Sequence, residues 1–153
     1  MLDEADLKIV AMLVRNARAS VREIARELGL SPSSVHARLQ RLVRSGVVKR
    51  FTAEVDQHAL GIGVTAITLL QVEGGRIVEV GERLAGNPHV VAVYDITGEF
   101  DLLVISKFRT VAELDRFLKQ LNRMEHVRRT VTSIALRVIK EDPSSAVAAL
   151  VGS

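Results

Sequence analysis

A stretch of small polar and basic side chains between residues 33 and 44 is suited to bind a polyanion. At about 100° per residue, Val35, Leu39 and Leu42 fall on one side of a helix, and the polar side chains fall on the other side and its flanks. The stretch contains no acidic residue. Short side chains let a helix enter the major groove of a duplex, where arginines reach bases or phosphates. The residues predicted to contact double-stranded DNA are Ser33, Ser34, His36, Ala37, Arg38, Gln40, Arg41 and Arg44.

Positive charge is concentrated around this stretch. The chain has 153 residues and a formal net charge of +3, yet residues 61–153 hold eleven basic and eleven acidic groups. Residues 15–50 carry nine basic groups against two acidic ones. A localised positive field points to nucleic acid as the partner, and Arg38 is expected to hold a phosphate.

Capping residues predict three helices that position these side chains. Asp3 caps the first helix, and Ser20 opens a capping box for the second, which ends at Gly29. Ser31 begins the third helix, which is predicted from about residue 32 to residue 44. Two helices joined through a glycine-containing turn, with the second one basic, are typical of a helix-turn-helix. A small helical bundle without a ligand is the alternative.

A repeated strand-helix-strand pattern fills the second part of the chain. Strands are predicted at residues 64–72, 90–96, 102–108 and 130–139, and helices at about 76–85 and 111–124. Two such units form a ferredoxin-like α+β sandwich, βαββαβ, with both helices on one face of the sheet. Because the strands are apolar on both faces, we expect a second copy to cover the open face, which predicts a homodimer.

Residues 30–42 carry a resemblance to a known family. They read Leu-Ser-Pro-Ser-Ser-Val-His-Ala-Arg-Leu-Gln-Arg-Leu, and a Gly-Val-Val follows at 46–48. This string resembles the winged helix-turn-helix of the leucine-responsive/asparagine-type (Lrp/AsnC) transcription regulators, and the likeness extends to about residue 141. The family often has Glu where this chain has Val43, a departure that concerns a local ion pair or partner contact and not the fold. The resemblance implies a sequence-specific DNA-binding regulator whose dimers assemble further, often to octamers.

The same resemblance divides the chain into four parts. A helix-turn-helix DNA-binding domain is expected at residues 1–52 and a linker strand at 53–63. A ferredoxin-like effector-binding and oligomerisation domain is expected at 64–141, followed by a tail at 142–153. The segment from residue 47 to residue 55 is predicted to be an exposed strand.

The resemblance also implies that the second domain binds a small amino acid or a related metabolite. Gly98 and Asp101 match the Gly-x-x-Asp effector motif of the family. Gly98 leaves room for a carboxylate at backbone amides, and Asp101 is a natural partner for an α-ammonium group. The alternative is that Gly98 only turns the hairpin and Asp101 only caps it. The residues assigned to this site are Tyr94, Thr97, Gly98, Glu99, Phe100, Asp101, Thr130, Thr132 and Ser133.

Catalysis and metal binding have little support in the sequence. The chain has no cysteine, and its four histidines fall in four separate elements without metal-ligand spacing. We therefore expect no enzyme activity, no cofactor and no metal. Two alternatives stay open: a haem-pathway tetrapyrrole decarboxylase with the same two-part layout, and a metabolite-sensing assembly module that does not bind DNA. No apolar run approaches the roughly 18 residues of a membrane span, and we expect a cytoplasmic protein.

Overall fold

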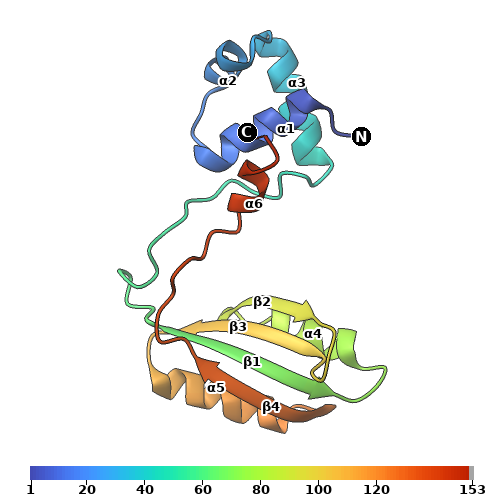
Figure 1. Cartoon of the computed structure of the whole chain (residues 1–153), viewed down its shortest axis with the longest axis vertical. Helices are drawn as coiled ribbons and strands as arrows, with labels where there is room; N and C mark the ends of the chain where they lie inside the picture. The colour runs from blue at the N-terminus through green and yellow to red at the C-terminus, as the bar shows by residue number, and fades with distance from the viewer. Residues whose placement is uncertain (152–153) are drawn as a thin grey trace. The chain divides into compact units, whose positions relative to one another are not determined.

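The computed structural model describes residues 1–151 and divides the chain into two compact units. One unit comprises Met1–Val55 together with the segment that begins at Lys140. The other unit comprises Asp56–Ile139. Figure 1 shows that the N-terminal part of the first unit is helical and that the second unit is a sheet with helices packed against it.

The first unit is built on three helices: α1 (Glu4–Arg15), α2 (Val21–Leu28) and α3 (Pro32–Arg44). The predicted caps are confirmed, because Asp3 and Asp6 form a capping box on α1 and Ser20 forms one on α2. Gly29 ends α2 at φ 66°, a left-handed conformation that glycine adopts without a side-chain clash. The helix-turn-helix is therefore present, with α3 bounded as the sequence predicts.

A small apolar core holds the three helices together. Ile9 of α1, Ile24 of α2, and Val35 and Leu42 of α3 are completely buried. Full burial of one such side chain stabilises a fold by about 1.5–3 kcal/mol. Because Val35 and Leu42 point inward, the opposite side of α3 is left for solvent or for a partner.

The predicted strand at residues 47–55 does not form within the chain, and no strand forms between residues 53 and 63. Val48 donates its backbone N–H to the carbonyl oxygen of Leu42 at 3.1 Å, which closes the end of α3 instead. A strand needs a neighbouring segment to complete its ladder of hydrogen bonds. No other segment of the described chain lies beside these residues as a strand partner, so the prediction was wrong for the single chain.

The second unit is an antiparallel sheet with two helices. Its elements are β1 (Val64–Val72), α4 (Ile77–Ala85), β2 (Val90–Asp95), β3 (Leu102–Phe108), α5 (Val111–Arg123) and β4 (Val127–Ile134). The strand order β2-β3-β1-β4 with all neighbours antiparallel is the ferredoxin-like arrangement, as predicted. The last strand differs from the prediction of 130–139. It starts three residues earlier and ends near Ala135, which donates to Thr65, because β1 begins at Val64 and offers no partner beyond it.

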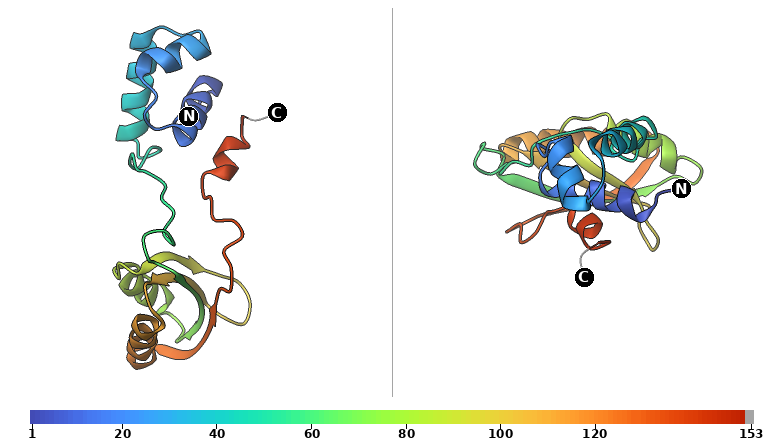
Figure 2. Two further views of the ribbon diagram at one scale, coloured as in Figure 1. Left: turned by 90° about the vertical axis from the view of Figure 1, so that its left-hand side faces the viewer. Right: turned by 90° about the horizontal axis from the view of Figure 1, so that it is seen from above.

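Both helices cover the same face of the sheet (Figure 2). On that face Leu70 of β1, Val104 and Phe108 of β3, Leu84 of α4 and Leu121 of α5 belong to one buried core. The opposite face carries the alternate residues of the strands. Its apolar members are Ile67, Leu69, Ala92, Tyr94, Leu103, Ile105 and Val131, none of which is fully buried in the single chain.

The C-terminal segment belongs to the first unit. After β4 the chain reaches a short helix, α6 (Ser145–Ala148), which lies against α1. None of the helices in residues 1–151 is long and apolar enough to cross a lipid bilayer.

Candidate DNA-binding surface and ligand site

The exposed side of α3 presents most of the residues that were predicted to contact DNA. Ser33, His36, Ala37, Gln40 and Arg44 are all exposed, and Ser34 is half-buried. Ser34 donates its backbone N–H to the Ser31 hydroxyl group as part of the helix cap. The outer side of α3 is therefore small and polar near the N-terminus and basic near the C-terminus.

Arg38 and Arg41 occupy a different part of α3, the flank that faces the start of α1. Arg38 Nη1 donates to both carboxylate oxygens of Asp3 at 2.7 Å and to Asp6 Oδ1 at 3.0 Å. Arg41 Nη2 donates to Asp6 Oδ1 at 3.0 Å and to Oδ2 at 3.1 Å. Two of the three arginines that were expected to contact DNA thus form ion pairs with the first helix.

The contacts of Asp3 and Asp6 with α3 were not predicted from the sequence. Asp3 was predicted to cap the first helix, and a cap usually leaves its carboxylate exposed. Asp6 is only 1% exposed, and its carboxylate accepts hydrogen bonds from Arg38, from Arg41 and from the backbone N–H of Asp3. The available signal was the pair of arginines three positions apart in α3, opposite two acids three positions apart in α1.

The contact with Arg38 favours the ionised form of Asp3. Hydrogen bonds from the Arg38 guanidinium group, and then from the backbone of Asp6, lower the pKa of Asp3 to about 2. Hydrogen bonds to the carboxylate of Asp3, and then to that of Asp6, raise the pKa of Arg38 above its usual value. Because the Asp3 pKa is depressed, its contribution to stability is present above pH 4 and is lost as the pH falls toward 2.

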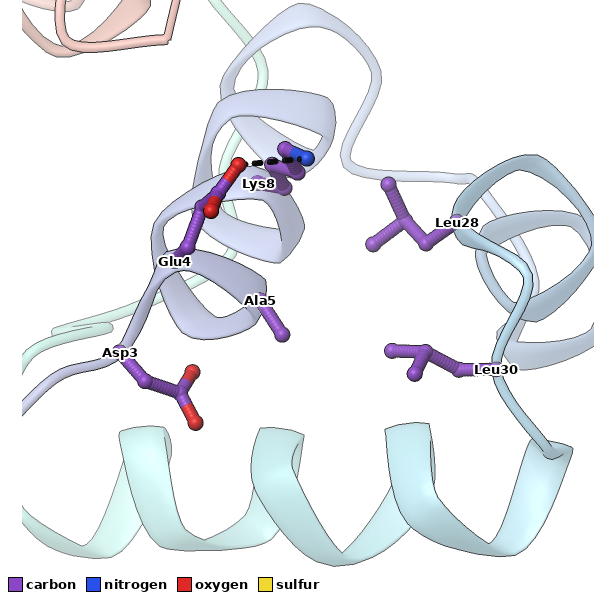
Figure 3. A pocket seen from close by; sticks show the side chains of 6 residues that line it. All are labelled: Asp3, Glu4, Ala5, Lys8, Leu28 and Leu30. Atoms are coloured by element: carbon purple, nitrogen blue, oxygen red, sulfur yellow. Dashed lines mark ion pairs between the residues drawn. The ribbon is translucent and has the colours of Figure 1, made fainter.

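A hollow of about 340 Å³ opens beside this ion-pair cluster (Figure 3). Leu28 and Leu30 lie across it from Ala5 of α1. Its charged side chains already have partners, because Asp3 pairs with Arg38, and Glu4 pairs with Lys8 at 2.8 Å. It offers no unpaired charge for a ligand, and we assign none.

The turn between β2 and β3 combines an open glycine with an anchored carboxylate. Gly98 adopts φ 110°, and a Cβ atom at this position would meet nothing within 4 Å. Asp101 Oδ2 accepts the backbone N–H of Val72 at 2.8 Å, and the Asp101 N–H donates to the carbonyl oxygen of Leu70 at 2.8 Å. Asp101 therefore fastens the turn to the end of β1, while its Oδ1 atom has no partner among the described residues.

Arg129 of β4, which the sequence did not single out, faces the same turn. Its Nη1 atom lies 3.4 Å from Glu99 Oε1, and its guanidinium carbon lies 5.5 Å from the centre of the Phe100 ring. Gln71 donates its side-chain amide to the carbonyl oxygen of Glu99 at 3.2 Å. The turn is thus held from β1 and β4 together.

The remaining predicted effector residues are spread over both faces of the sheet. Thr130 pairs with Leu70, beside the anchored turn, and its hydroxyl group donates to Asn122. Thr132 lies further along β4 and its hydroxyl group is 2.9 Å from the buried hydroxyl group of Thr68. Ser133 points to the opposite face, and Tyr94, paired with Leu103, is also on that face. Thr97 is exposed in the turn.

A second hollow, of about 250 Å³, separates α4 from the edge strand β2. It is lined by Ile77, Val78, Gly81, Glu82, Ala85, Val93, Asp95 and Leu102. Its lining is mainly aliphatic, and Asp95 immediately precedes the segment that leads into the turn.

Two of the four histidines, His89 and His126, make contacts within the second unit. His89 stacks on Phe108, with ring centres 4.8 Å apart, and its Nδ1 atom is 2.9 Å from the carbonyl oxygen of Lys107. His126 has φ 73° and its Nδ1 atom lies 2.9 Å from Glu73 Oε2, which lowers the pKa of Glu73. Within residues 1–151, no three His, Cys, Asp or Glu side chains gather in a way that would hold a metal ion.

Comparison with known proteins finds two matching families. Residues 2–49 match the family described as winged helix-turn-helix DNA-binding, and residues 65–145 match the Lrp/AsnC ligand binding domain. The chain is 39% identical over 141 residues to the HTH-type transcriptional regulator FL11 of Pyrococcus furiosus, covering 92% of this chain and 93% of the relative. It is 34% identical over 137 residues to the HTH-type transcriptional regulator LysM of Saccharolobus solfataricus, covering 89% and 94%.

Solved structures of similar proteins share both units. A transcriptional regulator from Neisseria meningitidis, solved in complex with L-Met, superposes with a TM-score of 0.83 at 25% identity, covering 94% of this chain and 96% of that chain. AsnC of Escherichia coli superposes with a TM-score of 0.82 at 21% identity, covering 92% and 96%.

Proposed function

Since the chain belongs to the Lrp/AsnC family of transcription regulators, and is a DNA-binding regulator with a ligand-binding domain, we propose which of its residues contact DNA and which hold the effector. The DNA-contacting surface is the outer side of α3. The effector site is the turn between β2 and β3. Each assignment has its own supporting observation and its own experiment.

The acid-free outer side of α3 carries the assignment of the DNA-contacting surface. Ser33, His36, Ala37 and Gln40 are exposed and short enough to approach base edges, and Arg44 reaches the backbone or a base from the last turn. Ser34, Arg38 and Arg41 lie on the flank of the same helix. The two arginines keep free N–H groups for phosphates beside their bonds to Asp3 and Asp6.

The experiment begins with sequencing of the DNA that crosslinks to the protein, which supplies a specific duplex. Titrations then compare that duplex with a random one at several salt concentrations. Arg44→Ala is expected to weaken binding and to reduce the salt slope by about one unit, because each phosphate contact releases about one counterion. Arg83→Ala, in α4 of the other unit, removes the same charge and is the control. Equal behaviour of both variants would refute the assignment of α3.

The effector assignment rests on Asp101 and Gly98. An α-amino acid needs an anion for its ammonium group and N–H donors for its carboxylate, and the turn offers Asp101 Oδ1 and the open backbone at Gly98. The related protein solved with L-Met supports an amino acid as the ligand class. Calorimetric titration with each of the twenty amino acids tests this proposal. Absence of heat with all of them would leave the domain as an assembly scaffold.

The open face of the sheet is proposed to bind a second copy of the chain. Ile67, Leu69, Leu103 and Ile105 occupy the centre of that face, where no element of the described unit covers them. A buried antiparallel sheet with two apolar faces is stable when another layer covers the second face. We propose a two-fold dimer that assembles further, to an octamer. Light scattering that reports a monomer of 16.7 kDa at micromolar concentration would refute it.

The relatives are named transcriptional regulators, in agreement with a role that is not enzymatic. We propose that the protein has no catalytic activity and acts in the cytoplasm, in the compartment that holds its DNA.

A two-fold dimer presents two copies of α3 to the DNA. The operator is therefore expected to contain two inverted half-sites whose centres lie about one helical turn apart, or a multiple of that distance.

A further inference from the structure

The carboxylate of Asp6 is the buried charge of the first unit that capping alone does not explain. Asp6 is 1% exposed, whereas the side chain of Asp3, which makes the other half of the cap, is 55% exposed. A buried carboxylate is tolerated only when opposite charges and hydrogen bonds compensate it. Arg38 and Arg41 of α3 supply the opposite charges, and the backbone N–H of Asp3 donates a further hydrogen bond.

The contacts of Asp6 determine how the two arginines are presented. Arg41 uses one terminal nitrogen, Nη2, for both oxygens of Asp6, and its side chain remains 56% exposed. Arg38 uses only Nη1 for Asp3 and Asp6 and remains 24% exposed. The other N–H groups of both guanidinium groups have no acceptor among residues 1–151. Each guanidinium group is planar, so fixing one edge also fixes the direction of the other edge.

The cluster is electrically balanced. Two carboxylates, Asp3 and Asp6, face two guanidinium groups, Arg38 and Arg41, so the four side chains together add no net charge to the surface. If these arginines acted only as positive charges, pairing them with acids would weaken the attraction to DNA. The pairing instead lowers the entropy cost of binding, because an arginine side chain that is already held by a carboxylate loses less conformational freedom when it contacts DNA.

We propose that Asp6 is a positioning residue for DNA recognition: it holds Arg41, and with it Arg38, so that their outward N–H groups meet the DNA in one fixed geometry. The proposal rests on the assignment of α3 as the DNA-contacting helix. Asp6 itself does not touch DNA. It raises the preference for the specific site at the expense of general electrostatic attraction.

The test compares Asp6→Asn with Glu4→Gln in the full-length protein. Each variant removes one negative charge from the first turn of α1, but Glu4 forms its ion pair with Lys8 of the same helix and not with α3. Fluorescence anisotropy with the specific duplex and with a random duplex gives a specificity ratio for each protein. Asp6→Asn is expected to lower that ratio roughly tenfold, by weakening specific binding while random binding stays equal or becomes tighter. Glu4→Gln is expected to leave the ratio unchanged.

The result that overturns the proposal is a specificity ratio of Asp6→Asn equal to that of Glu4→Gln and wild type. If Asp6→Asn loses its helical circular dichroism or its cooperative unfolding, the variant is misfolded, and the specificity ratio of Arg41→Lys is measured in its place. That variant keeps the charge and the Asp6–Arg38 contact, but an ammonium group cannot hold a carboxylate and a phosphate on two fixed edges. A lowered ratio in Arg41→Lys supports the proposal, and a wild-type ratio overturns it.

The wild-type protein separates this proposal from the one on which it rests. If wild type shows no preference for the crosslinked duplex, the assignment of α3 fails, and the role of Asp6 fails with it. If wild type discriminates and Arg44→Ala weakens binding while Asp6→Asn keeps the full ratio, only the role of Asp6 is refuted.

Discussion

Replacement of Asp101 is expected to separate a structural role of this carboxylate from a role in ligand binding. Oδ2 accepts the backbone N–H of Val72 at 2.8 Å, and Val72 is only 6% exposed. Asp101→Ala leaves that N–H without a partner at a site that water reaches poorly. An unpaired buried donor costs about 1–3 kcal/mol, so we expect the free energy of unfolding to fall by that amount. For a unit of roughly 60–100 residues each 1 kcal/mol lowers Tm by about 4–8 °C.

Asp101→Asn removes the charge and keeps an oxygen that accepts the Val72 N–H. Its stability is therefore expected to stay within about 1 kcal/mol of wild type, because only the charge assistance of one hydrogen bond is lost. Both variants are expected to lose the heat of amino acid binding, since neither offers an anion to an α-ammonium group. Asp95→Asn, an exposed acid at the end of β2, removes the same charge and is the control for both measurements.

Differential scanning calorimetry at fixed protein concentration and isothermal titration with amino acids measure the two effects. Asp101→Ala that unfolds at the wild-type temperature would refute the role of the hydrogen bond to Val72. Asp101→Asn that binds an amino acid as tightly as wild type would show that the carboxylate is not the partner of the ammonium group. Random-duplex binding by Asp101→Asn is expected to equal that of wild type.

Three further predictions follow from the same structure. Leu69→Asp places a charge at the centre of the open face of the sheet, so light scattering is expected to report a lower molecular mass than for wild type. An unchanged mass would contradict dimerisation through that face. Gly98→Ala is expected to lower the free energy of unfolding by about 1–3 kcal/mol, because residue 98 has a φ of 110°. Gly74→Ala is the control, since Gly74 has open space and no positive φ and its replacement is not expected to destabilise the protein. Equal Tm values for the two variants would argue against strain at Gly98. Since the pKa of Asp3 is lowered to about 2, this group is expected to leave Tm unchanged above pH 5 and to lower Tm below pH 4. Asp3→Asn is expected to remove part of that fall in Tm. The same dependence of Tm on pH in Asp3→Asn and wild type would contradict the prediction.

Local elements were predicted well because their signals lie within a few residues. The caps at Ser20 and Ser31 and the start of α3 depend on side chains next to the backbone that they satisfy. The end of β4 was predicted too late, since it depends on where β1 begins more than sixty residues earlier. The extended segment after α3 was expected to be a strand, and it lacks a partner within the single chain.

In the candidate sites too, features that depend on neighbouring residues were predicted, and contacts between residues far apart in the sequence were not. Residue type and spacing sufficed to predict the basic outer side of α3 as a candidate DNA-contacting surface, whereas the turn with Gly98 and Asp101 was predicted as an effector site from the family resemblance. The sequence did not show that Arg38 and Arg41 bind Asp6, because the acids and the arginines are more than thirty positions apart. Nor did it show that Arg129 contacts the turn.

The sequence by itself determined the order of α1 to α5 and of β1 to β4, the two-part organisation and the surface that carries positive charge. Hydrophobic periodicity, capping and glycine positions act over short stretches, so they can be seen without coordinates. Only the tertiary structure decided which charges meet. In the sequence Asp6 is an acidic residue of the first helical turn, and in the fold it is a buried partner of two arginines. Asp101 uses one oxygen to close the end of β1, while the other has no partner within the described chain. Hydrogen bonds and ion pairs form over distances of about 3 Å, and such distances between distant residues are set by the packing of whole elements rather than by any local pattern.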